Sequence, residues 1–113
     1  MDALRAAYLR DTLAYCDEIE AEVLRVLEIK FEWSRESAGP VMKRYLERGL
    51  RVRISGKLKN ICRDANDDMV VECALVAHAQ IIVSGDKDLL SLGKYSDIIV
   101  LSPAAYLMQD LAP

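Results

Sequence analysis

The feature that most constrains the fold is a short apolar run, Ile81–Val83, which ends at Ser84 and Gly85 and is followed by Asp86 and Asp88. A run of β-branched residues between turn residues is typical of a strand buried on both faces of a parallel sheet. Open α/β sheets bind their ligands just outside the C-terminal ends of the strands, where these two aspartates would lie. The pattern therefore predicts an α/β fold with a functional site directly after this strand.

The rest of the chain alternates between helical and strand-like patterns. Such alternation is typical of the α/β class, in which a mostly parallel sheet is flanked by helices. With 113 residues, of which 52% are hydrophobic, the chain suits one compact domain over residues 1–113. The expected helices lie at residues 2–9, 17–29, 40–48 and 68–77, near 89–92 and after 102–103, and the expected strands at residues 13–16, 52–54, 81–83 and 98–101.

Asp68 is expected at the same edge of the sheet as Asp86. In a right-handed crossover the helix at residues 68–77 begins at the edge where the strands end, and Asp68 stands at its start. Converging carboxylates repel one another unless a cation lies between them, and hard oxygen ligands favour Mg²⁺ or Mn²⁺. The sequence therefore predicts a metal site formed by Asp68, Asp86 and Asp88.

Helix capping is the competing interpretation for these acids. Asn66 or Asp67 is expected to cap the helix at 68–77, so that Asp68 is the preferred ligand and Asp67 the alternative. Asp64 is interpreted as a turn residue. Asp86 and Asp88 also fit a turn followed by the cap of a short helix, although Asp86 is the strongest candidate for a site role.

Charge is divided unevenly along the chain. Residues 43–63 carry eight basic side chains and one acidic one, whereas residues 64–88 carry six acidic side chains and one lysine. A basic segment beside an acidic cluster suits a metal-dependent enzyme that acts on a polyanion, although an ordinary solvated surface is the simpler alternative. The residues predicted to bind nucleic acid are Arg48, Arg51, Arg53, Lys57 and Lys59.

Several classes of protein do not fit the sequence. The three cysteines lack the spacing of a zinc site or a disulfide framework, and Cys73 is expected in the core. The one histidine, His78, offers no Ser/His/Asp system. There is no signal peptide and no apolar run long enough to cross a membrane, so a cytoplasmic protein that does not bind membranes is expected.

The chain resembles the PIN-domain nucleases, specifically the branch of toxins from toxin–antitoxin systems. The resemblance rests on EAEVLRVL at residues 20–27, CRDANDD at 62–68, ECALVAHAQIIVSGDKDLLSLG at 72–93 and IIVLSPAAYL at 98–107. It implies a three-layer α/β fold, an acidic cluster that holds Mg²⁺ or Mn²⁺, cleavage of single-stranded RNA and an antitoxin protein as partner. Glu22, Asp68 and Asp86 match the catalytic acids of the family, and Asp88 matches an accessory acid.

One departure from the family pattern concerns the N-terminal strand. The family opens on a central strand that ends in Asp-Thr-Asn, and the Asp11-Thr12 pair echoes that motif only superficially because Leu13 follows it. We interpret residues 13–16 as the family's second strand, which leaves the first strand and its aspartate without a counterpart. Open sheet edges then predict a homodimer or larger assembly. The two functions that fit are a ribonuclease of reduced activity and a non-catalytic remnant that binds RNA or an antitoxin.

Overall fold

The computed structural model describes residues 11–30 and 32–108 and shows an α/β fold, as the sequence predicts. The helix expected at residues 2–9 lies outside the described residues. No helix in the described part is long and apolar enough to cross a membrane. The strands are β1 (Ala14–Tyr15), β2 (Leu50–Arg51), β3 (Ile81–Val83), β4 (Lys94–Tyr95) and β5 (Ile98–Leu101), and the helices are α2 (Asp17–Lys30), α3 (Arg35–Leu46), α4 (Ala65–Val76), α5 (Lys87–Leu92) and α6 (Pro103–Met108).

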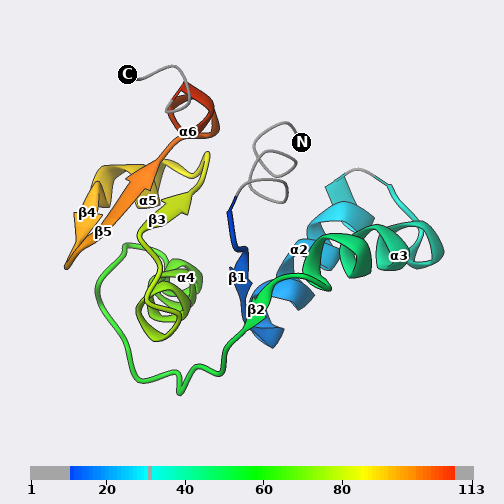
Figure 1. The fold of residues 1–113 in the computed structure, drawn as a ribbon, viewed down its shortest axis with the longest axis horizontal. Coiled ribbons are helices and arrows are strands. Elements are labelled where there is room, and N and C mark those ends of the chain that lie inside the picture. Colours follow the sequence, from blue (N-terminus) through cyan, green and yellow to red (C-terminus); the bar gives the residue numbers. More distant parts are fainter. Residues whose placement is uncertain (1–10, 31, 109–113) are drawn as a thin grey trace.

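The described strands form two sheets, and helix α4 packs against both of them (Figure 1). In the first sheet β1 and β2 are parallel. In the second, β5 lies between β3, to which it is parallel, and β4, to which it is antiparallel. The predicted parallel pairing is therefore present in both sheets. Helix α4 thus contacts one strand of each sheet, β1 in the first and β3 in the second.

The main core lies between one face of the second sheet and helices α4 and α5. Its buried members are Val71, Ala74, Ile82, Leu89, Ile98 and Val100. The opposite face is more open, since Val83 is 38% exposed and Ile99 is 46% exposed. The strand Ile81–Val83 was expected to be buried on both faces. Among the described residues only the face toward α4 and α5 is buried.

Gly49 allows the first sheet to form. A Cβ atom at this position would lie 2.9 Å from the Leu13 carbonyl oxygen and 3.1 Å from a ring carbon of Tyr15. The Leu50 amide donates a hydrogen bond of 2.7 Å to that same Leu13 oxygen, and the Val52 amide donates one of 2.8 Å to the Tyr15 oxygen. The glycine is therefore needed for the close approach that places β2 beside β1.

The larger differences between the predicted and the observed element boundaries have local causes. Helix α3 begins at Arg35 rather than at Pro40, since the Ser34 hydroxyl accepts from the Ser37 amide at 3.2 Å and caps it. Strand β2 lies at residues 50–51 instead of 52–54, where Gly49 permits pairing. Helix α4 begins at Ala65 because its cap is Asp64 rather than Asn66 or Asp67.

The open sheet edges support a prediction about assembly. Among the described residues, β1 has one strand neighbour and so does β3, which leaves backbone N–H and C=O groups along their other edges. Since unpaired edges favour pairing with another chain, we expect a homodimer or larger assembly in solution. Light scattering at micromolar concentration measures the mass directly. A stable monomer would contradict this expectation.

Candidate metal centre

Three carboxylates meet at the edge between β3 and α4. One oxygen from each of Asp67, Asp86 and Asp88 lies within 4.8 Å of the others. Asp67 belongs to the first turn of α4, whereas Asp86 and Asp88 flank the start of α5, directly after β3. Of the residues predicted for the site, the structure brings Asp86 and Asp88 together, and α4 contributes Asp67, the residue next to the expected Asp68.

Helix α5 fixes the position of Asp86. The Asp86 Oδ1 atom accepts hydrogen bonds from the Asp88 amide at 2.8 Å and from the Leu89 amide at 3.3 Å, and so caps the helix. The Asp86 amide donates to the Ser84 hydroxyl at 3.0 Å, which holds the turn before it. Because Leu89 is buried in the core, this capped turn is tied to the rigid part of the molecule. The Asp86 side chain therefore both caps α5 and belongs to the acidic cluster.

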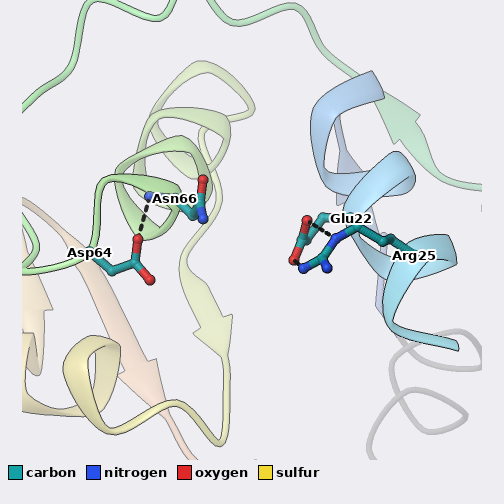
Figure 2. A network of polar contacts seen from close by, with 4 residues as sticks. All are labelled: Glu22, Arg25, Asp64 and Asn66. Carbon is teal, nitrogen blue, oxygen red and sulfur yellow. Dashed lines mark hydrogen bonds and ion pairs between the residues drawn. The ribbon is translucent and has the colours of Figure 1, made fainter. Parts of the chain in front are cut away.

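Asp67 is placed by the cap of α4. The Asp64 carboxylate accepts from the Asn66 amide at 2.9 Å, as Figure 2 shows, and the Asp67 amide donates to the Asp64 carbonyl oxygen at 3.0 Å. Asp64 and Asp67 are three residues apart, the spacing of a capping pattern in which an acid occupies the third helical position. That spacing was available in the sequence as a signal for the correct helix start.

The environment of Asp67 fits a bound cation. The side chain is 8% exposed, and its Oδ2 atom is buried with no hydrogen-bond partner in the described part of the chain. Burial, together with the negative charges of Asp86, Asp64 and Asp88, raises the pKa of Asp67 to about 6. A buried carboxylate that lacks a donor for one of its oxygens and lies beside further carboxylates is a costly arrangement, which a divalent cation would relieve. The donor set, all carboxylate oxygen, suits Mg²⁺ or Mn²⁺.

Asp68, the ligand preferred from the sequence, lies outside this cluster. Its two oxygens accept hydrogen bonds from the backbone amides of Asn60, at 3.1 Å, and Cys62, at 2.7 Å. The side chain is 5% exposed and is directed to the loop that precedes α4. The side chains of successive helix residues point about 100° apart, so Asp67 and Asp68 lie in different surroundings. The geometry favours Asp67 over Asp68 as a ligand.

Glu22 also lies apart from the cluster. It is on α2, and its carboxylate pairs with the Arg25 side chain one turn along the same helix, at 2.5 Å (Figure 2). The hydrogen bond and the charge of Arg25 hold the pKa of Glu22 below its usual range. Glu22 and Arg25 form an exposed pair typical of a helix surface. In this arrangement the Glu22 carboxylate is directed to Arg25 and not to the aspartates.

The residues predicted to bind nucleic acid fall into two groups. Arg48 lies in the turn between α3 and β2 and lines a pocket with Asp11 and Tyr45, and Arg51 lies on β2. The Arg51 guanidinium pairs with the carboxylates of Asp17 and Glu20 on α2, and it lies 4.9 Å from the centre of the Tyr15 ring. The Arg51 guanidinium therefore already has carboxylate partners within the molecule.

The second group lies on the loop that approaches the acidic cluster. Arg53, Lys57 and Lys59 are exposed and have no ion-pair partner among the residues that the structure describes. Arg63, which was not singled out from the sequence, is also exposed, and its Nε atom lies 4.0 Å from the Asp88 carboxylate. The loop thus presents positive charge to solvent and ends beside the candidate metal centre.

An α/β fold with an acidic cluster after a parallel strand is compatible with a metal site, and a comparison with known families identifies the family. A family model described as PIN domain matches residues 4–88. The chain therefore belongs to the PIN-domain family, which is part of a nuclease superfamily. No curated protein and no solved structure gives a significant match. The family assignment made from the sequence is confirmed, while the toxin branch stays a prediction.

Proposed function

We propose that this PIN-domain protein is a Mg²⁺- or Mn²⁺-dependent nuclease that cleaves single-stranded RNA. The observation that carries the proposal is the convergence of Asp67, Asp86 and Asp88 within 4.8 Å, with the Asp67 Oδ2 atom buried and without a hydrogen-bond partner among the described residues. A cluster that combines a deeply buried oxygen with two more accessible carboxylates can hold an ion and leave part of its surroundings open to substrate.

Each residue of the site has a defined role in this proposal. Asp67, Asp86 and Asp88 would hold the ion, which when bound would activate water and offset charge on the scissile phosphate. The Asp86 carboxylate keeps its orientation through its bonds to the α5 amides. Arg53, Lys57 and Lys59 would contact the RNA backbone through charge, so that binding weakens as salt increases. Asp68, assigned to the site from its position in the sequence, and Glu22, assigned from the family likeness, take no part in this arrangement.

The test of the proposed function is cleavage of a labelled single-stranded RNA in Mn²⁺ or Mg²⁺. We expect EDTA to abolish cleavage and Asp86→Asn to reduce it by about 10²-fold, since a lost ligand misplaces the ion. Asparagine caps helices as well as aspartate, so α5 should remain folded in the variant. Cleavage that is equal in parent and variant would show a contaminating nuclease or a different site.

The alternative function is a non-catalytic protein that binds RNA or an antitoxin, and it is favoured by the position of Glu22 away from the cluster. RNA binding without metal-dependent cleavage would support it. The same measurement on double-stranded RNA and single-stranded DNA separates the RNA proposal from a nuclease with another substrate. An antitoxin protein as partner stays a prediction.

A further inference from the structure

The segment that joins β2 to α4, residues 52–63, is an extended loop with two distinct sides. We call it the basic strap. Its apolar residues are half-buried against the body of the domain, and its basic residues are exposed. The half-buried set is Val52, Ile54, Leu58, Ile61 and Cys62, and the exposed set is Arg53, Lys57, Lys59 and Arg63.

Glu72 on α4 binds the first half of the basic strap. Its carboxylate accepts hydrogen bonds from the Ser55 amide at 2.6 Å, the Ser55 hydroxyl at 3.0 Å, the Gly56 amide at 3.2 Å and the Leu58 amide at 3.3 Å. The side chain is 7% exposed. One buried carboxylate therefore holds the backbone on both sides of Lys57.

Asp68 binds the second half in the same manner. It stands one helical turn before Glu72, on the same side of α4, and accepts from the amides of Asn60 and Cys62. Gly56 and Asn60, which each donate to one of these carboxylates, have φ angles of 77° and 62°. Glycine and asparagine are the residues that adopt this left-handed conformation most readily. The sequence of the strap is thus suited to the two bends that direct its amides at α4.

The charge of Glu72 is compensated by backbone donors. Burial alone would raise its pKa, but the bonds from Ser55, Leu58 and Gly56 outweigh that effect and hold the pKa of Glu72 below its usual range. No lysine or arginine of the described part forms an ion pair with Glu72 or with Asp68. A carboxylate in such a position is usually paired with a nearby basic side chain, here Lys57 or Lys59. In this structure the two lysines remain available to an external anion.

We propose that Glu72, assisted by Asp68, is a positioning residue that shapes the basic strap into a track for the RNA backbone. This inference rests on the proposed function, because the polyanion is the proposed RNA substrate. The track runs from Arg53 through Lys57 and Lys59 to Arg63, beside the Asp88 carboxylate. A single strand bound along it is delivered to the candidate metal centre.

The test measures binding of a labelled single-stranded RNA in EDTA, where no cleavage occurs, over a series of salt concentrations. Glu72→Gln keeps the shape of the side chain but turns an amide group toward backbone donors. We expect its RNA affinity to fall about 10-fold at low salt. The slope of log affinity against log salt concentration should become less steep by about 1.4, the value for two lost phosphate contacts on a single strand. Glu72 and Asp68 together accept six hydrogen bonds from the basic strap. Asp68→Asn affects two of these, so its RNA affinity should fall less.

Three controls separate positioning from charge and from unfolding. Glu47→Gln removes the same charge from an exposed position at the end of α3, and removing an acid should by charge alone strengthen RNA binding. The double variant Lys57→Ala, Lys59→Ala removes the proposed contacts directly. Adding Glu72→Gln to it should cause little further loss, because both changes act on the same contacts. Amide hydrogen exchange should be faster at residues 55–58 in Glu72→Gln and unchanged in β5.

The outcomes distinguish this inference from the proposed function. RNA binding by Glu72→Gln that equals or exceeds that of Glu47→Gln would overturn the positioning role while leaving the ribonuclease proposal intact. Fully additive losses in the combined variant would also overturn it. If the parent binds no single-stranded RNA even at low salt, the proposed function fails and the RNA track fails with it, whereas slow exchange at residues 55–58 would still show that Glu72 holds the loop.

Discussion

Replacing Asp67 with asparagine is expected to reduce metal-dependent RNA cleavage by about 10²-fold and, in the same variant, to stabilise the metal-free protein. The loss of cleavage follows from removing the most deeply buried of the three converging carboxylates. The gain in stability follows because the ionised Asp67 is buried among other acids without a donor for its Oδ2 atom. Removing that charge at pH 7 should raise the free energy of unfolding by about 2 kcal/mol.

Asp68→Asn is the matched control, since it makes the same chemical change one residue along the chain. Its carboxylate accepts two backbone hydrogen bonds, so the variant should lose about 1–3 kcal/mol of stability. Cleavage at saturating RNA should fall less than about 10-fold, because Asp68 is directed away from the cluster. Urea unfolding in EDTA measures the stabilities, and single-turnover cleavage measures the activities. If Asp68→Asn loses more cleavage than Asp67→Asn, the assignment of the ligand reverts to Asp68.

The strands that the sequence predicts best are those whose apolar residues make long-range contacts. Ile81–Val83 and Ile98–Leu101 are found with the predicted bounds, because each is a β-branched run between turn residues. The strand at Lys94–Tyr95 was not predicted, since it is a two-residue element held by antiparallel pairing with β5 rather than by an apolar pattern of its own. The separation of the described strands into two sheets depends on which strand edges pair. Such pairing joins residues far apart in the chain, so a local sequence pattern does not predict it.

Two of the three carboxylates that lie together in the structure are among the predicted site residues. Asp86 and Asp88 follow from the rule that ligands bind where parallel strands end. Choosing between Asp67 and Asp68 required the start of α4 to within one residue, and the cap had been assigned to the wrong side chain. The sequence does not indicate a role for Glu72, because its partners are the Ser55 hydroxyl and three backbone amides 14 to 17 residues earlier in the chain, and no local pattern reveals them.

The contribution of Asp67 to the stability of the metal-free protein should fall as pH rises from about 4 to about 6. The pKa of Asp67 is about 6 in the folded state and 3.8 as its ordinary value. Between these values the folded state holds a proton that the unfolded state has lost, so raising the pH favours unfolding. The difference of pKa corresponds to about 3 kcal/mol, present at low pH and lost above pH 6. Asp67→Asn should lack this contribution.

Mn²⁺ should reverse the trend, because the ion competes with the proton for the Asp67 carboxylate. Its stabilising effect is then small near pH 4 and increases as pH rises through about 6. Urea unfolding at a series of pH values, in EDTA and in Mn²⁺, measures both effects. Other carboxylates contribute to each curve, so the informative quantity is the difference between the parent and Asp67→Asn. Identical pH dependence in the two proteins would mean that Asp67 ionises as an ordinary surface acid, and it would contradict the buried, destabilised carboxylate from which the metal site is proposed.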